Sequence, residues 1–276
     1  MKVYDCVTYC GEDLLLQIRL ETLNKDIDKF IIIEGNRYFN GEKKPQFFKL
    51  ENFEKFKDKI KYYFIKDFPT HDGDNYKYEN YQRNQIIRGF GRLKKEDMVL
   101  LSDVDEIPNL KNKNFLDYDS AVFLQKMYYY KFNIHLYKGL KWKNNTWAGT
   151  KGCKLKFFET GEKIRRLRVR NIPWWRFDKK VKRYVEPNGG WHFTFLMKST
   201  DISKKLMRFK HEIDLLLTDK NYDINNLLDS DEIEKRILEL KDPYNRDNIK
   251  LKKVKINSTF PEYIIKNIDK LSDYIA

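Results

Sequence analysis

The stretch Met98-Val99-Leu100-Leu101-Ser102-Asp103-Val104-Asp105-Glu106-Ile107-Pro108 joins an apolar run to three carboxylates within four positions. A short apolar run bounded by turn residues is typical of a buried strand, so these carboxylates stand where the strand ends. Carboxylates this close repel one another unless a cation lies between them, and oxygen ligands suit Mg²⁺ and Mn²⁺. The stretch therefore predicts a divalent metal site at a strand end, with a surface acidic turn as the alternative.

Strand and helix patterns alternate around this stretch. Strands are predicted at 3–8, 30–33, 60–65, 98–102 and 121–126, and helices at 12–23 and 80–93. This order is expected of an α/β fold in which helices flank a mostly parallel sheet. Ligands of such sheets bind beyond the carboxyl ends of the strands. Glu34 and Asp103 both stand at such ends, so we expect both at the ligand-binding edge.

The second half of the chain has a different pattern. Residues 127–190 are rich in aromatic and basic residues in short alternating pieces, which predicts a β-rich insertion. Helices are predicted at 202–217, 230–240 and 261–275, with a polar loop at 219–226. Because we find no internal repeat and no low-complexity linker, we expect one continuous domain over residues 1–276, with halves at 1–126 and 127–276.

Composition narrows the class of protein. The 276 residues include 55 Lys+Arg against 41 Asp+Glu, a net charge of +14. This charge favours anionic partners such as nucleotides, nucleic acid or anionic glycolipid surfaces, and a Lys- and Asn-rich coding bias explains it equally well. The 3 cysteines are too few for a disulfide framework. With no apolar run of membrane-spanning length and no signal-like start, we expect a soluble, cytoplasmic protein, with peripheral contact at a membrane as an alternative.

The acidic stretch resembles the signature of glycosyltransferase family 17, whose members include the enzyme that adds the bisecting N-acetylglucosamine to N-glycans. Further blocks are similar to that family in the same order: Tyr4-Asp5-Cys6 with residues 12–20, Ile33-Glu34-Gly35-Asn36, Phe39-Asn40-Gly41 with Lys44-Pro45, Gly190-Trp191-His192-Phe193 and residues 261–267. The segments 140–185 and 205–255 do not obviously match. The resemblance therefore covers the donor side of the site better than the acceptor side.

The resemblance implies a GT-A-like (Rossmann-like) fold, a nucleotide-sugar donor, a divalent metal and an inverting transfer. It assigns residues 1–126 to the nucleotide-sugar-binding half and residues 127–276 to the acceptor side. The expected reaction moves N-acetylglucosamine from UDP-N-acetylglucosamine to a hydroxyl of a glycan or glycolipid acceptor, which includes anionic acceptors. Two other readings stay open. One is a metal-dependent nucleic-acid-binding or phosphodiester-processing protein, and the other is a noncatalytic carbohydrate-binding protein.

Asp103, Asp105 and His192 are the predicted ligands of Mn²⁺ or Mg²⁺. Neutral imidazole binds manganese, although a histidine packed in the core by Trp191 is the alternative for His192. Asp105 enters catalysis through this metal, which would neutralise the leaving diphosphate. Gly190, with the glycine before it, would let the backbone approach a phosphate.

Glu34, Arg83, Asn84, Asp103 and Trp191 are the residues predicted to bind the nucleotide sugar. Glu34 would accept hydrogen bonds from uracil or ribose, or would cap a turn. A guanidinium suits a diphosphate and an amide suits a ribose, but a solvated basic helix face explains Arg83 and Asn84 as well.

The catalytic base is expected to be a carboxylate within hydrogen-bond reach of the acceptor hydroxyl. Glu106 is preferred because it adjoins the metal site, and Glu212 is the alternative. The basic stretch 163–183 contains ten Lys/Arg with Trp174 and Trp175 among them. It has three readings: solvated strand faces around core tryptophans, a site for an anionic or sugar acceptor, or a single-stranded nucleic-acid site.

Overall fold

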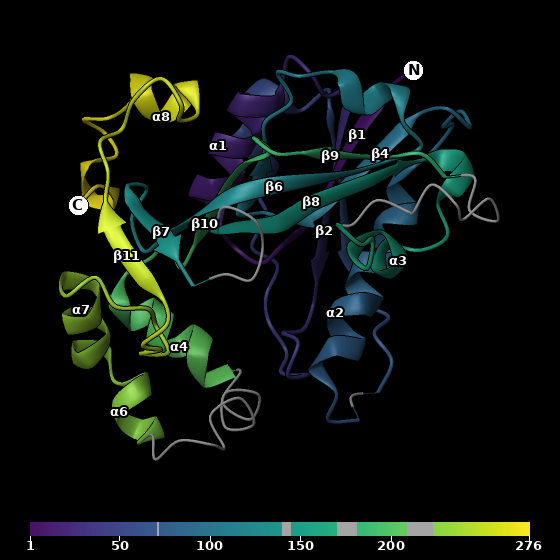
Figure 1. Cartoon of the computed structure of the whole chain (residues 1–276). Helices are drawn as coiled ribbons and strands as arrows, with labels where there is room; N and C mark the ends of the chain where they lie inside the picture. The colour runs from purple at the N-terminus through teal and green to yellow at the C-terminus, as the bar shows by residue number, and fades with distance from the viewer. Residues whose placement is uncertain (71, 140–144, 170–180, 209–222) are drawn as a thin grey trace. The chain divides into compact units, whose positions relative to one another are not determined.

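The computed structural model describes residues 1–70, 72–139, 145–169, 181–208 and 223–276 (Figure 1). The chain forms two compact units. Unit 1 comprises Met1–Gln125 and Ala148–His192, and unit 2 comprises Lys126–Trp147 and Phe193–Ala276. Among the described residues, no helix combines the length and the apolar character that crossing a bilayer requires.

Unit 1 is built on a mostly parallel sheet. Its parallel strands lie in the order β3 (Ile60–Ile65), β2 (Lys29–Gly35), β1 (Val3–Tyr9) and β4 (Met98–Asp103). The sheet continues through β8 (Thr146–Lys154), antiparallel to β4, to β6 (Ser120–Tyr129), which pairs in parallel with β9 (Arg183–Glu186). The short β5 (Glu106–Pro108) pairs antiparallel with β10 (Gly190–Thr194). The predicted α/β class and all five predicted strands are confirmed.

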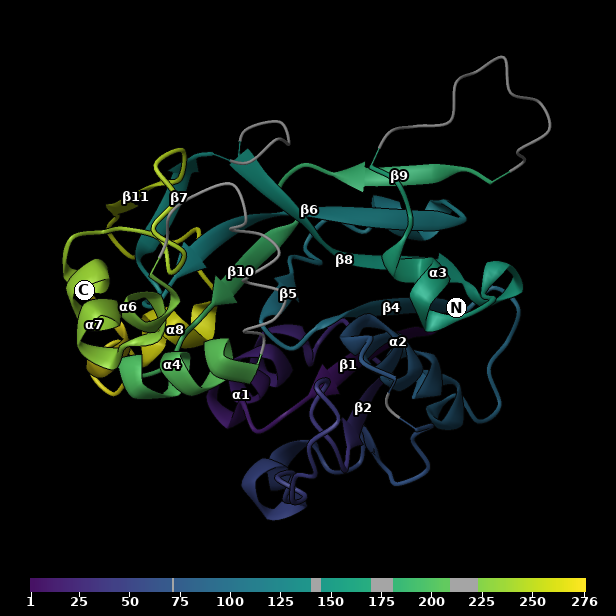
Figure 2. The same cartoon turned by 90° about the horizontal axis from the view of Figure 1, so that it is seen from below.

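Helices cover both faces of this sheet. On one face, buried residues of β1, β2 and β4 share a hydrophobic cluster with Ile86, Phe90 and Ile164. These three residues belong to or adjoin η2 (Gln85–Gly89) and α3 (Gly161–Arg165), which lie beside α2 (Asn75–Asn84) (Figures 1 and 2). On the other face, α1 (Asp13–Leu23) contacts the sheet through Arg19, which bonds Asp5 and Ser102.

The strand register explains how Glu34 and Asp103 lie at the same edge and yet apart. On β1, Thr8 is the partner of Asp103, whereas Tyr9 is the partner of Glu34. Successive side chains of a strand point to opposite faces, and register partners share a face. Asp103 therefore lies on the face covered by α2 and α3, and Glu34 lies on the face covered by α1.

Two predicted helices differ from the structure. The helix predicted at 80–93 begins earlier, at Asn75, because Asp74 caps it by accepting from two backbone N–H groups. It tightens into η2 and ends before Gly91, whose φ of +56° a helix cannot continue. The helix predicted at 261–275 is the short α8 (Glu262–Lys266), because the backbone of Asn267 leaves helical geometry, with a φ of −118° and a ψ of 26°.

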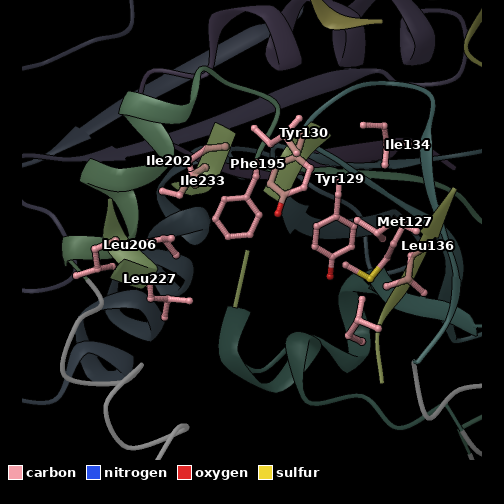
Figure 3. Packing of buried hydrophobic residues seen from close by; sticks show 14 residues of the cluster. Met127, Tyr129, Tyr130, Ile134, Leu136, Phe195, Ile202, Leu206, Leu227 and Ile233 are labelled. Atoms are coloured by element: carbon pink, nitrogen blue, oxygen red, sulfur yellow. The ribbon is translucent and has the colours of Figure 1, made fainter. Parts of the chain in front are cut away.

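Unit 2 has its own core, shown in Figure 3. One face of β7 (Ile134–Lys138) and β11 (Lys250–Lys253) packs with α4 (Ser199–Arg208), α6 (Ile224–Leu228) and α7 (Ser230–Leu238). The rings of Tyr129, Tyr130 and Phe195 lie at its centre. The remaining short helical turns are η1 (Leu50–Phe56), η3 (Asn114–Asp117), η5 (Leu155–Phe157) and η6 (Ser272–Tyr274).

The predictions for the second half have mixed outcomes. The helix predicted at 230–240 is confirmed as α7, and α4 covers 199–208, while residues 209–217 lie outside the described residues. The loop predicted at 219–226 contains the start of α6, capped by Asp223.

Residues 127–190 contain β7, β8 and β9 but also α3, so a β-rich insertion stays a prediction. Residues 148–192 belong to unit 1 rather than to a separate second half, and whether both units act as one domain stays a prediction.

Candidate active site

The acidic turn, Asp103–Glu106, connects β4 to β5. The backbone N–H of Asp103 donates to Oε2 of Glu106 at 3.0 Å, which closes the turn on itself. The side chain of Asp103 is 35% exposed and that of Asp105 is 17% exposed, whereas that of Glu106 is 1% exposed. A ligand can therefore reach Asp103 and Asp105 directly, while Glu106 is buried beside them.

A buried arginine of α1 supports the turn from the face that α1 covers. Nη1 of Arg19 donates to the carbonyl oxygens of Glu106 at 2.8 Å and Asp103 at 3.3 Å. Its Nε and Nη2 bind both carboxylate oxygens of Asp5, and Nη2 also reaches the Ser102 hydroxyl at 2.6 Å. Arg19 and Asp5 are both fully buried, and a buried ion pair is tolerated only when its hydrogen bonds are satisfied in this way. Arg19 thus ties the backbone of the turn to the sheet.

Two further arginines bind the carboxylates of the turn. Arg83 of α2 contacts Asp103 through Nη2, at 3.0 Å from Oδ1 and 3.3 Å from Oδ2. Arg165 of α3 holds both oxygens of Glu106, at 2.6 Å through Nη1 and 3.0 Å through Nη2, and its Nη2 lies 3.3 Å from Oδ2 of Asp103. A second carboxylate, Glu79, accepts from Arg83 at 2.6 Å. Carboxylates and guanidinium groups therefore alternate across the site.

The close packing of α2 against α3 brings these arginines together. The Oδ1 atom of Asn84 accepts from the backbone N–H of Glu162 at 2.9 Å, which joins the end of α2 to the start of α3. A Cβ atom on Gly161 would stand 2.3 Å from the carbonyl oxygen of Arg83, so only glycine permits this approach. Asn84 therefore joins two helices, an arrangement that favours a structural role over the predicted contact with a nucleotide.

Electrostatics keep Asp103 and Arg165 ionised. Burial acts to raise the pKa of the Asp103 carboxyl, but Arg83 and Arg165 outweigh it, so that this pKa lies well below its ordinary value. Burial acts to lower the pKa of Arg165, but Glu106 and Asp103 raise it overall. At neutral pH Asp103 is thus a carboxylate and Arg165 a cation.

His192 and Asp105 lie together as predicted. Nε2 of His192 is 3.4 Å from Oδ2 of Asp105, and His192 pairs in register with Glu106 on β5. Burial acts to lower the pKa of His192, and Asp105 raises it above its ordinary value. Trp191 is 6% exposed, so its ring is largely packed inside the protein. Gly190 has a φ of +117°, and a Cβ atom at this position would stand 2.2 Å from the carbonyl oxygen of Ile107. The space beside Gly190 is therefore filled by the backbone of Ile107 and is not open to a phosphate.

Glu34 is engaged inside the protein. Its Oε1 accepts from Lys44 Nζ at 2.6 Å and from the backbone N–H of Phe47 at 2.8 Å. Its Oε2 accepts from Tyr62 at 2.8 Å and from the backbone N–H of Phe48 at 3.1 Å. The residue is fully buried. These contacts anchor the segment 44–48 to β2, and they favour the turn-capping alternative over contact with a nucleotide.

Sequence reasoning missed Arg19 and Arg165. Arg165 stands in the basic stretch 163–183, which we had considered for an acceptor, and Arg19 stands on a correctly predicted helix. No sequence signal identifies these two arginines, because their partners in the acidic turn lie 59 and 87 positions away. Glu212, Trp174 and Trp175 lie outside the described residues, so nothing tests their predicted roles.

The donors of the site fit a divalent cation in part. Within the described ranges, no group of three or more His, Cys, Asp and Glu side chains is arranged to hold a metal ion. Mg²⁺ is commonly held by one or two carboxylates together with substrate phosphates, without a complete protein cage. Asp103 and Asp105 supply that number of carboxylates on the partly exposed side of the turn. Together with two arginines, which bind phosphates in bidentate fashion, the site can receive a phosphorylated ligand.

Comparison with known proteins relates the chain to one family. The model of a family described as Glycosyltransferase family 17 matches residues 1–165 of this 276-residue chain. The match contains the sheet from β1 to β8, the acidic turn and all three arginines that bind it, and ends at Arg165. His192 lies beyond the match, and so does all of unit 2 except residues 126–147. None of the curated proteins matches the chain at a significant level.

Proposed function

The chain belongs to glycosyltransferase family 17, and we propose that it moves N-acetylglucosamine from UDP-N-acetylglucosamine to a hydroxyl of a glycan or glycolipid. The observation that carries this proposal is the ionised acidic turn at the carboxyl end of β4, bound by Arg83 and Arg165. That edge is where open α/β sheets bind their ligands. We further propose that unit 1 corresponds to a GT-A-like donor domain.

In this proposal the diphosphate of the donor lies against Arg83 and Arg165, with Asp103 nearby. Asp103, Asp105 and His192 would hold Mn²⁺ or Mg²⁺, which when bound neutralises charge on the leaving diphosphate. The arginines contribute to the same end, because guanidinium groups in a partly buried site stabilise developing negative charge.

The transfer itself is an in-line displacement with inversion. The acceptor oxygen forms a bond to the anomeric carbon, the bond from that carbon to the diphosphate breaks, and UDP leaves with the electron pair. A carboxylate takes the proton of the acceptor hydroxyl. Both oxygens of Glu106 already accept from Arg165, and one also accepts from Asp103. This engagement favours a positioning role for Glu106 and leaves Glu212 as the candidate for the base.

The proposed acceptors include anionic glycolipids, with peripheral contact at a membrane, because unit 2 carries a basic face. We define the basic face as Lys126, His135, Tyr137 and Lys252, which share one side of β6, β7 and β11. Lys252 pairs in register with His135, and its Nζ lies 5.2 Å from the ring centroid of the exposed Tyr137. Burial, Lys126 and Lys252 lower the pKa of His135 to about 4, as expected where positive charge prevails. The cytoplasmic location stays a prediction.

A thermal-shift measurement with an activity assay tests the proposal. UDP with Mn²⁺ should raise Tm, since a ligand that binds the folded state stabilises it, and UDP should be released from UDP-N-acetylglucosamine in the presence of glycan acceptors. Both signals should be lost in Asp105→Ala and kept in Asp117→Ala, which alters an exposed carboxylate of η3. Stabilisation by a single-stranded oligonucleotide alone, with affinity falling steeply with salt, would instead indicate the nucleic-acid alternative.

A further inference from the structure

Asp103 is accessible to a ligand, but both of its carboxylate oxygens already lie beside arginine groups. Its Oδ1 lies 3.0 Å from Arg83 Nη2 and 3.4 Å from the Thr8 hydroxyl, and its Oδ2 lies 3.3 Å from both Arg83 Nη2 and Arg165 Nη2. A divalent ion bound to either oxygen would be a close neighbour of two guanidinium groups. The repulsion between like charges opposes that arrangement in a partly buried site. Metal binding at Asp103 therefore requires that the arginines find another partner.

The contacts of the two arginines differ in a way that makes such an exchange feasible. Each arginine has its shortest contact to a different carboxylate, Arg83 to Glu79 and Arg165 to Glu106, both at 2.6 Å. Their contacts to Asp103 are longer, at 3.0 to 3.3 Å. When Asp103 turns away, Glu79 and Glu106 keep the arginines in place. Asp103 can therefore give up its contacts with both arginines while Arg83 stays bound to Glu79 and Arg165 stays bound to Glu106.

Arg83 also has unused hydrogen-bonding capacity. A guanidinium group carries five N–H donors. Arg83 is 8% exposed, and its buried Nε has no hydrogen-bond partner in the part of the chain that the structure describes. A buried donor without a partner is costly, and a phosphate oxygen would satisfy it. This observation, independent of the acidic turn, indicates an anionic ligand beside Arg83.

We propose that the nucleoside diphosphate and the divalent cation bind this site together, by an exchange of ion pairs. Arg83 and Arg165 pass from Asp103 to phosphate oxygens, and Asp103 passes to the cation. The proposal rests on the proposed function for the identity of the diphosphate. The diphosphate alone leaves Asp103 without a counter-charge, and the cation alone lies beside two guanidinium groups that no phosphate has drawn away. Each ligand therefore raises the affinity for the other, and by linkage the two effects are equal.

The first test measures free Mn²⁺ by electron paramagnetic resonance, with no nucleotide present. Wild-type protein should retain little Mn²⁺, whereas Arg83→Met should retain it at least tenfold more tightly, because Asp103 loses the closer of its two arginines and of its arginine contacts keeps only that with Arg165 at 3.3 Å. Arg88→Met is the matched control, since Arg88 follows on η2 and pairs with Asp67 outside the site. The gain should vanish in the double variant Arg83→Met/Asp103→Asn. Equal Mn²⁺ affinity in wild type and Arg83→Met would overturn the proposal, and Arg83→Gln serves if the methionine variant does not fold.

The second test uses wild-type protein in calorimetric titrations of UDP and of GDP, with and without Mn²⁺. A rise in nucleotide affinity of about 5- to 150-fold with Mn²⁺ is the expected coupling. Affinity that does not change with Mn²⁺ overturns the exchange but leaves the proposed function intact. A different pair of results would contradict the proposed function alone. In that case neither nucleotide binds in any condition, while Arg83→Met still retains Mn²⁺ as expected from the displacement of the arginine by metal.

Discussion

Arg165 holds Glu106 through two parallel hydrogen bonds, at 2.6 and 3.0 Å, across 59 positions of the sequence. The pair joins α3 to the acidic turn, and Glu106 in turn accepts from the N–H of Asp103. The orientation of the turn therefore depends on a residue that lies on another element, outside the acidic motif.

We expect Arg165→Met to lower the free energy of unfolding by about 3–5 kcal/mol, because removing one partner leaves the buried Glu106 charge uncompensated. Arg165→Lys keeps the charge but not the bidentate geometry, so its loss should be smaller. Urea unfolding measures both. Arg166→Met, an exposed neighbour paired with Glu162, is the control and should unfold like the wild type. A loss in Arg165→Met no larger than in Arg166→Met would show that the pair does not support the turn.

Glu34→Gln should also destabilise the protein by about 3–5 kcal/mol, because Lys44 would keep a buried charge without its counter-ion. If Glu34 anchors the segment 44–48, the KM for the sugar donor should change little in the fraction that stays folded. The control is Glu54→Gln, whose carboxylate is exposed and pairs with Lys57 at the surface. A large rise in donor KM with unchanged urea unfolding would restore the predicted contact with the nucleotide.

The difference between Glu34 and Asp103 shows how far sequence reasoning extends. The apolar runs before Glu34 and Asp103 predicted both strand ends correctly, because a short run of apolar residues indicates a buried strand. Which face each side chain takes depends on the register with β1, a relation between segments distant in sequence. The same limit explains why Arg19 and Arg165 were missed: their partners are brought near by the fold and not by spacing along the chain.

The pKa of His135, lowered to about 4 by burial and by Lys126 and Lys252, gives a stability that depends on pH. An unfolded histidine titrates near pH 6.5, so between about pH 6.5 and 4 the unfolded chain binds a proton that the folded protein does not. This contribution is present above pH 6.5 and is lost as pH falls toward 4. His135→Gln should flatten that slope in urea unfolding at several pH values.

A direct measurement of the same group is the imidazole resonance of His135 in nuclear magnetic resonance spectra. It should titrate near pH 4 in the wild type and at higher pH in Lys126→Met/Lys252→Met, with burial keeping part of the shift. Titration near pH 6.5 in the wild type would contradict the predicted environment of His135.

The basic face of unit 2 should bind anionic vesicles. Each lysine near an anionic membrane contributes about 1 kcal/mol, so Lys126→Gln and Lys252→Gln should each weaken binding about fivefold at low salt. Sedimentation with vesicles that contain phosphatidylserine measures this, with phosphatidylcholine vesicles as the neutral comparison. Lys57→Gln removes an exposed lysine of unit 1 and should leave binding unchanged. Equal binding by all three variants would show that the net charge of the chain, and not this face, governs adsorption.

Arg19 links β1, the end of β4 and both ends of the acidic turn through one buried charge. A folding intermediate that had docked α1 without forming the turn would bury this charge with part of its partners missing. Such a species is disfavoured, so we expect the turn and the sheet beneath it to form in a single cooperative step. As denaturant is added, catalytic competence and the native sheet should then disappear at the same midpoint, and an inactive but otherwise native protein should not accumulate.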